Sequence, residues 1–257
     1  MKAMVLAAGL GTRLRPLTDD RPKALVTVAG RTLLEIALTR LRTAGVTEVI
    51  VNAHHFGDQI EGFLKSGKDF GMRVEVSREA DLLDTGGGIK HAAWFFLEAG
   101  PDREGPFPSR EAPFIVHNVD VISTIDLTRM IRARAEGNAL ATLAVAARES
   151  SRQLIFDEQG NLCGRRAGRD PQAELVGPAM KLQPLAFSGI HVISPRIFSL
   201  MHETGAFSII DVYLRLAAQG ERITAFRADE YYWRDLGRPE SIAAVERDIA
   251  SGAYFAE

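Results

Sequence analysis

Short apolar runs alternate with amphipathic segments through the first half of the chain, and this alternation limits the folds that the chain can adopt. The segments place apolar residues at the three- and four-residue spacing of one helix face, whereas the runs are too short to form helices. We therefore predict an α/β fold, a three-layer α/β/α, Rossmann-like arrangement with a mostly parallel, mixed central sheet. The predicted strands are 4–6, 49–51, 74–76 and 114–116, and the predicted helices are 33–41, 56–64 and 89–97.

The second half of the chain is less regular, and we expect it to extend the same sheet. A turn-forming segment at 158–161 separates the stretch 153–156 from Leu162 and predicts a hairpin. The proline-rich stretch 100–113 and the polar stretch 165–178 are interpreted as surface loops. The remaining predicted strands are 139–146 and 186–193, and the remaining predicted helices are 196–201, 209–218 and 239–249.

Composition argues against several classes of protein. The 257 residues can bury a full core, and 31 basic against 33 acidic residues leave a net charge of −2, which indicates neither a nucleic-acid partner nor a membrane surface. No apolar run approaches the roughly 20 residues that cross a bilayer, and the short run after Met1 does not resemble a signal peptide. The single cysteine, Cys163, fits a reducing compartment. We expect a cytoplasmic monomer or small homo-oligomer.

A glycine-rich turn follows the first predicted strand. It contains Gly9 and Gly11, then Thr12 and Arg13, and Lys23 follows ten residues after the arginine. Glycine lets a backbone approach a phosphate closely because it has no Cβ, and successive backbone N–H groups can form a concave anion site. Arginine adds a planar fork for phosphate oxygens, and lysine adds a point charge. The turn therefore predicts a site for a nucleoside triphosphate.

Other glycine-rich turns fit this stretch less well. A dinucleotide-binding turn has a third glycine where Leu14 stands, and Pro16 interrupts the helix that should follow. A P-loop needs four residues between its glycines and a lysine directly after the second, and neither is present. A turn without a ligand would not require Thr12, Arg13 and Lys23 in one exposed segment.

Five stretches carry a resemblance to a known family. They are 6–23, 23–30 (Lys-Ala-Leu-Val-Thr-Val-Ala-Gly), 84–88 (Asp-Thr-Gly-Gly-Gly), 118–120 (Asn-Val-Asp) and 233–237 (Trp-Arg-Asp-Leu-Gly). Together they resemble the motifs of the sugar-1-phosphate nucleotidylyltransferases, which make a nucleotide-sugar and pyrophosphate from a nucleoside triphosphate and a sugar 1-phosphate. The Asp-Thr-Gly-Gly-Gly stretch in so short a chain is most similar to the N-acetylmuramate 1-phosphate uridylyltransferases and their mannose-1-phosphate guanylyltransferase relatives.

The resemblance implies a single nucleotidyltransferase domain over 1–257, with a nucleotide-binding half at 1–135 and a sugar-phosphate-binding half at 136–257. It implies base recognition by Ala8, Gly9 and Gly86, although 86–88 could also be a flexible hinge before a helix. The implied catalytic residues are Arg13, Lys23, Asp120 and Asp235. The implied nucleotide-binding residues are Leu6, Ala7, Ala8, Gly9, Gly11, Thr12, Arg13, Lys23, Asn52, Thr85, Gly86 and Asn118. The implied substrate-binding residues are Arg148, Ser188 and Gly189.

Magnesium is the implied cofactor, because Mg²⁺ prefers oxygen ligands and takes one or two carboxylates together with phosphates and waters. The resemblance pairs Asp120 with Asp235 as its ligands. The alternatives are a capping or turn role for Asp120 and an ion pair of Asp235 with Arg234 or Arg238. No general base is required, since a phosphate monoester is already an anion at neutral pH.

Two positions depart from the family pattern. Ala24 stands where a proline is usual, and Val119 replaces the glycine between Asn118 and Asp120, which makes that turn bulkier. From the resemblance we expect the substrates to be UTP and N-acetylmuramate 1-phosphate. The alternatives are a mannose-1-phosphate guanylyltransferase, a glucose-1-phosphate thymidylyl- or uridylyltransferase, and a non-catalytic binding module. A phosphocholine cytidylyltransferase is a further alternative, for which Tyr231, Tyr232 and Trp233 could form an aromatic cage.

Overall fold

The computed structural model describes residues 1–98, 112–167, 173–177 and 181–254. The loop predicted at 100–113 lies almost wholly outside these residues. A mixed sheet of ten strands forms the centre of the structure, and its main path runs β11-β10-β9-β12-β6-β1-β4-β5. The strands of this path are β1 (Lys2–Leu6), β4 (Glu48–Ala53), β5 (Arg73–Arg78), β6 (Phe114–Asn118), β9 (Arg152–Phe156), β10 (Leu162–Ala167), β11 (Glu174–Leu175) and β12 (Gln183–Ile193).

Strand direction differs between the two halves of the sheet. In the first half, β1 pairs in parallel with both β4 and β6, and β4 pairs in parallel with β5. In the second half, β12 runs antiparallel to β6, β9 and β8 (Ala141–Ala146), and β13 (Ile223–Arg227) lies parallel to β8. Parallel neighbours place their carboxyl ends at one edge, where ligands bind in open α/β sheets.

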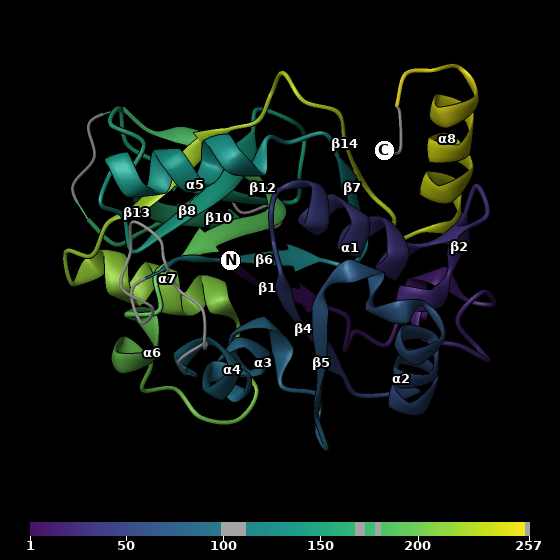
Figure 1. Cartoon of the computed structure of the whole chain (residues 1–257). Coiled ribbons are helices and arrows are strands. Elements are labelled where there is room, and N and C mark those ends of the chain that lie inside the picture. Colours follow the sequence, from purple (N-terminus) through teal and green to yellow (C-terminus); the bar gives the residue numbers. More distant parts are fainter. Residues whose placement is uncertain (99–111, 168–172, 178–180, 255–257) are drawn as a thin grey trace.

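Helices cover both faces of the sheet and create two apolar cores (Figure 1). On β1, Ala3 and Val5 belong to one core and Met4 to the other, because successive side chains of a strand point to opposite faces. The first core includes residues of α1 (Leu33–Thr43), α2 (Gly57–Ser66), α5 (Leu127–Glu136) and α8 (Pro239–Ala250). The second includes residues of α3 (Asp84–His91), α4 (Ala93–Leu97), α6 (Ile197–Leu200) and α7 (Ile209–Ala218). This layering confirms the predicted α/β/α fold.

Two local predictions were wrong. The glycines at 86–88 lie inside α3 and not in a loop before a helix, because their missing Cβ atoms allow close packing against other segments. A Cβ at Gly86 would lie 2.5 Å from the Phe207 ring, and one at Gly87 would lie 2.6 Å from the Gly205 carbonyl oxygen. The stretch predicted as a loop at 165–178 contains the end of β10 and all of β11, which pair with each other; its residues 168–172 and 178 lie outside the described part.

Short strands escaped the sequence analysis because few apolar residues mark them. β7 (Val121–Ser123) pairs antiparallel with β14 (Trp233–Asp235), and β2 (Thr27–Val28) pairs with β3 (Arg31–Thr32). β13 was also missed. The predicted hairpin is confirmed, since β9 and β10 are antiparallel neighbours.

Candidate active site

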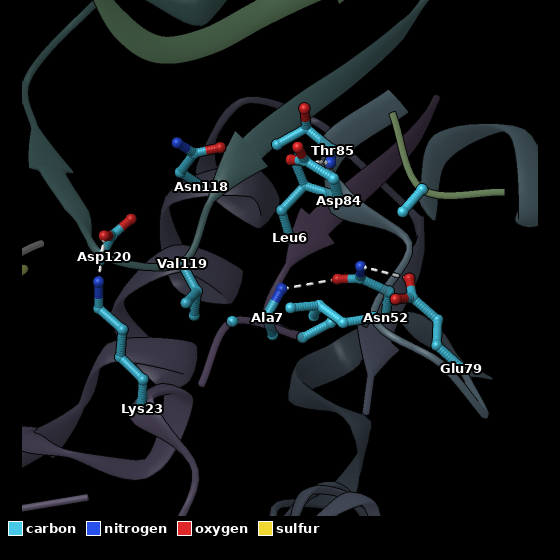
Figure 2. Close-up of a pocket in the computed structure, with 14 residues that line it drawn as sticks. Leu6, Ala7, Lys23, Asn52, Glu79, Asp84, Thr85, Asn118, Val119 and Asp120 are labelled. Carbon is cyan, nitrogen blue, oxygen red and sulfur yellow. Dashed lines mark hydrogen bonds and ion pairs between the residues drawn. The ribbon is translucent and has the colours of Figure 1, made fainter. Parts of the chain in front are cut away.

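A cavity of about 410 Å³ lies at the carboxyl ends of β1, β4 and β6 (Figure 2). The end of β1 and the glycine-rich turn supply its central wall, and the segments after β5 and β6 supply its sides. Eight residues predicted to bind the nucleotide line it: Leu6, Ala7, Ala8, Gly9, Lys23, Asn52, Thr85 and Asn118. Asp120, Val119, Glu79, Leu82, Asp84 and Ala206 complete the lining.

Lys23 and Asp120 form an ion pair at one side of the cavity, where Figure 2 shows their side chains pointing toward each other. Lys23 begins the short 3-10 helix Lys23–Leu25, and Asp120 lies in the turn between β6 and β7. The two side chains are only 11% and 17% exposed, so solvent screens their attraction less than at an open surface. The lysine that the sequence assigned to phosphate binding therefore contacts the carboxylate assigned to the metal.

A relay of hydrogen bonds holds the opposite side of the cavity. The buried Asn52 accepts the backbone N–H of Ala7 at 2.6 Å and donates to Glu79 at 2.7 Å. Glu79 is itself buried, and its second oxygen accepts the backbone N–H of Leu83 at 3.4 Å. Asn52 thus positions the glycine-rich turn, in addition to facing the predicted base side.

The remainder of the glycine-rich turn closes beside the cavity and does not line it. Gly11 has φ of +65°, and a Cβ there would lie 2.9 Å from Thr18 Cγ2, so the turn requires glycine at this position. The Thr18 hydroxyl also donates to the Gly11 carbonyl at 2.9 Å. Thr12 and Arg13 lie in the 3-10 helix Thr12–Leu14 and are exposed. Gly86 is buried, and its N–H donates to the Phe207 carbonyl at 2.9 Å, so it too lies outside the lining.

The β7–β14 ladder brings Asp235 beside Asp120. Asp235 is paired with Val121, the residue after Asp120, and the N–H of Leu236 donates to the Asp120 carbonyl at 2.8 Å. Arg13 lies at the same place, because a Cβ on Gly237 would sit 2.6 Å from Arg13 Nη2 and 2.7 Å from Asp235 Oδ1. Three of the four predicted catalytic residues, Arg13, Asp120 and Asp235, therefore lie together at one end of the β7–β14 ladder. Lys23 joins this group through its ion pair with Asp120.

The two carboxylates of this group suit Mg²⁺. Asp120 and Asp235 offer hard carboxylate oxygens, and Mg²⁺ commonly needs only one or two of these beside phosphate and water. Across the residues that the structure describes, no three His, Cys, Asp or Glu side chains gather into a metal site. An ion held by the two aspartates would thus keep open positions for phosphate oxygens. Arg234 pairs with Asp248 at 2.6 Å, so the alternative pairing of Asp235 with Arg234 is not found.

The three residues predicted to bind the second substrate form one cluster. Arg148 donates to the Ser188 hydroxyl at 2.9 Å and to the Phe187 carbonyl at 2.6 Å. Gly189 has φ of +74°, and a Cβ there would lie 2.8 Å from the Asn118 amide nitrogen, so the cluster adjoins the nucleotide cavity. Burial lowers the pKa of Arg148, while the nearby charge of Asp235 raises it.

The aromatic residues at 231–233 do not form a cage. Tyr231 stacks on Phe226, with ring centroids 6.2 Å apart, and Tyr232 stacks on Tyr254. The Trp233 ring instead lies under the Arg148 guanidinium, 3.6 Å from the ring centroid. Since each ring has its own partner, this feature no longer supports a phosphocholine enzyme.

Glu79 and Asp84 are polar lining residues that the sequence analysis missed. Glu79 follows β5 directly, as Asn52 and Asn118 occur at the ends of β4 and β6, so its position after a predicted strand was the available signal. Asp84 belongs to the Asp-Thr-Gly-Gly-Gly stretch, where only Thr85 and Gly86 were assigned. Val119, noted only as a departure, also lines the cavity, and its N–H donates to the Leu6 carbonyl at 3.1 Å.

Comparison with known proteins defines the class to which this fold and site belong. The sequence model of the nucleotidyl transferase family matches residues 2–156. The chain therefore belongs to the nucleotidyl transferase family, a family of transferase enzymes, and the resemblance to the sugar-1-phosphate nucleotidylyltransferases is confirmed.

Individual relatives match half of the chain or nearly all of it. The N-acetylmuramate alpha-1-phosphate uridylyltransferase of Caulobacter vibrioides is 34% identical over 257 residues, which cover 96% of both chains. The Neisseria meningitidis enzyme of the same name is 43% identical over 129 residues, half of each chain. A crystal structure of UDP-glucose pyrophosphorylase complexed with UDP-glucose superimposes with a TM-score of 0.76 over 98% of both chains; at 20% identity it shows the shared fold.

In the part of the chain that the structure describes, none of the helices is long and apolar enough to cross a membrane.

Proposed function

We propose that this protein is a sugar-1-phosphate nucleotidyltransferase that joins UTP to N-acetylmuramate 1-phosphate and releases pyrophosphate. The observation that carries the proposal is the meeting of Lys23, Asp120, Asp235 and Arg13 beside a cavity at the carboxyl ends of parallel strands. The substrates are inferred from the Caulobacter vibrioides relative, which matches over nearly its full length. The division into halves at 1–135 and 136–257, within one domain, belongs to the same proposal.

The reaction brings together two phosphate groups that repel each other, so neutralising their charge is the main catalytic task. In our proposal the triphosphate lies along the turn formed by Ala8 to Thr12, with its base toward Asn52 and Thr85. Arg13 neutralises the triphosphate and the departing pyrophosphate, and Lys23 moves from Asp120 to a phosphate oxygen. Asp120 and Asp235 hold Mg²⁺, which supplies positive charge at the reacting phosphates when bound.

The remaining predicted residues contact the substrates on either side of this centre. Leu6, Ala7, Gly9 and Gly11 shape the nucleotide wall, and Asn118 contacts ribose or phosphate. Gly86 acts on the base through the position of α3. Arg148, Ser188 and Gly189 contact the sugar 1-phosphate from the second half of the chain.

The substrate pair is tested by a matrix of UTP, GTP, dTTP and CTP against the 1-phosphates of N-acetylmuramate, mannose and glucose, with Mg²⁺. We expect UTP with N-acetylmuramate 1-phosphate to give the highest kcat/KM for pyrophosphate release. Highest activity with GTP and mannose 1-phosphate, or with dTTP or UTP and glucose 1-phosphate, would favour the corresponding alternative. A matrix without any activity would favour the non-catalytic binding module.

A further inference from the structure

Arg148 is a half-buried guanidinium whose position is fixed on three sides. Its Nη1 donates to the Ser188 hydroxyl at 2.9 Å, its Nη2 donates to the Phe187 carbonyl at 2.6 Å, and its plane lies over the Trp233 ring at 3.6 Å. Trp233 is held in turn, because its indole N–H donates to the Ser188 carbonyl at 2.8 Å. The residues that fix the side chain are thus all neutral.

No carboxylate among the described residues lies within ion-pair distance of Arg148. Two other arginines near the site do have one: Arg227 pairs with Asp229 at 2.7 Å, and Arg234 with Asp248 at 2.6 Å. Removing a guanidinium from water without a counter-ion is costly unless something compensates it. A guanidinium has five N–H donors, and the two bonds to Ser188 and Phe187 leave donors for an oxyanion.

Arg148 lies next to the reacting centre. Trp233 and Asp235 are two residues apart on β14, so their side chains project from the same face of that strand. The guanidinium stacked on Trp233 is close enough to Asp235 to be influenced by its charge. On its other side, Ser188 adjoins Gly189, which lies against the amide of Asn118 in the cavity wall.

We propose that Arg148 binds the phosphate group of the sugar 1-phosphate and holds it for attack on the nucleotide. This inference rests on the proposed function. In the reaction, an oxygen of that phosphate forms a bond to the α-phosphorus, the bond from the α-phosphorus to the bridging oxygen of the β-phosphate breaks, and its electron pair leaves with pyrophosphate. No proton has to move, because the attacking phosphate is already an anion.

The arrangement of cations supports the phosphate as the group that Arg148 binds. Arg13 and Lys23 come from the first half of the chain and lie on the side of the glycine-rich turn. Arg148 comes from the second half and lies over Trp233, which is on the same strand as Asp235. The attacking phosphate must approach Asp120 and Asp235 from outside the nucleotide cavity, so it needs a cation on that side. A planar fork held by Ser188 and Trp233 provides that charge together with a fixed orientation.

The test compares Arg148→Met with Arg148→Lys and with Arg227→Met as a matched control. Arg227 lies on β13 opposite Val145 of β8, near the end of the strand that precedes Arg148, and pairs with Asp229. We expect Arg148→Met to raise the KM for the sugar 1-phosphate about 10- to 100-fold, the effect of losing a charged hydrogen-bond pair. The KM for the nucleotide should stay within about twofold, Arg148→Lys should recover part of the loss, and Arg227→Met should behave like wild type.

Inhibition by the sugar that lacks its phosphate distinguishes the phosphate from other anionic groups of the substrate. We expect the inhibition constant of this sugar to be the same for wild type and Arg148→Met. If the variant weakens the phosphate-free sugar and the sugar 1-phosphate by the same factor, Arg148 contacts the sugar itself and the assignment to phosphate is wrong.

Two further results separate this inference from the proposed function. A wild-type enzyme that makes nucleotide-sugar, with an Arg148→Met variant of unchanged KM, overturns the role of Arg148 alone. A wild-type enzyme that makes no nucleotide-sugar from any substrate pair overturns both. If Arg148→Met fails to fold, as judged by thermal melting, Trp233→Leu replaces it, because this variant removes the ring over which the guanidinium lies. We then expect the KM for the sugar 1-phosphate to rise about threefold to tenfold; an unchanged value contradicts the inference.

Discussion

At the scale of single residues, Lys23 forms an ion pair with Asp120, the carboxylate that we assign to the metal. The Lys23 side chain neutralises Asp120 in the absence of substrate, so the pair avoids leaving an uncompensated charge in a largely buried position. A triphosphate would compete for Lys23, and its departure would free Asp120. We therefore expect binding of nucleotide and of divalent cation to favour each other.

Lys23→Met tests this coupling without any turnover. Removal of the ammonium should tighten the binding of Mn²⁺ to the nucleotide-free protein by about fivefold, since a partly buried ion pair is worth on the order of 1 kcal/mol. The affinity is measured by electron paramagnetic resonance of free Mn²⁺. Lys65→Met is the control, because Lys65 is 80% exposed and lies on α2, away from the site. Equal Mn²⁺ affinity in wild type and Lys23→Met would show that the lysine does not compete with the cation.

At the scale of elements, α3 shows how tertiary packing overrides local preference. Three consecutive glycines disfavour a helix and were predicted to precede one, with a flexible hinge as an alternative, yet they lie in the first two turns of α3. The reason lies in the chain 118 to 121 residues later, where Gly205 and Phe207 approach the α3 backbone. This contact could not be predicted from the sequence near residue 86.

Replacement of these glycines should therefore destabilise the protein, although alanine is the better helix former. At Gly87 a Cβ would lie 2.6 Å from the Gly205 carbonyl oxygen and 3.0 Å from Leu83 Cβ, so we expect Gly87→Ala to cost about 1–3 kcal/mol. At Gly62 of α2 a Cβ would meet nothing within 4 Å, so Gly62→Ala should add about 0.5–1 kcal/mol. Urea denaturation measures both free energies of unfolding. A stabilised Gly87→Ala variant would contradict the packing of α3.

At the scale of the whole molecule, one sheet joins strands from both halves of the chain, and its junction is the antiparallel pair of β6 and β12. The fold class followed from the sequence because strands such as 4–6 and 114–116 are apolar and evenly separated by helices. The cavity beside the turn near Gly9 also followed, since this turn continues a predicted strand. The position of Asp235 relative to Asp120 required the β7–β14 ladder, whose three-residue strands leave no periodic signal. The role of Glu79 could not be predicted from the sequence, because it depends on a contact with Asn52 that forms only in the folded chain.

Two histidines at this junction make stability depend on pH. Burial lowers the pKa of His117 on β6 to about 4 and that of His191 on β12 to about 3, from 6.5 in each case. Between pH 6.5 and 4 the unfolded chain binds protons that the folded chain does not, so the free energy of unfolding falls as the pH falls through this range. The stabilisation is fully present above pH 6.5.

We expect His117→Gln to lose about 2 kcal/mol of the stability difference between pH 7 and pH 4.5. The difference is measured by urea denaturation at the two pH values. His202→Gln serves as the control, since His202 is exposed. A variant with the full pH dependence of wild type would show that His117 does not take up protons on unfolding.

The central claim is that Asp120 and Asp235 serve transfer of a nucleotidyl group to a sugar 1-phosphate. Its most direct test is Mg²⁺-dependent pyrophosphate release, with ³¹P detection of the nucleotide-sugar, by wild type, Asp120→Asn, Asp235→Asn and the surface control Asp58→Asn, whose side chain is 90% exposed. We predict that wild type and Asp58→Asn form product, that chelation of the metal stops both, and that either site variant loses at least about a hundredfold in kcat with unchanged thermal melting. A folded Asp120→Asn or Asp235→Asn protein with wild-type activity, or a wild-type protein that forms no nucleotide-sugar from any pair, would contradict the account.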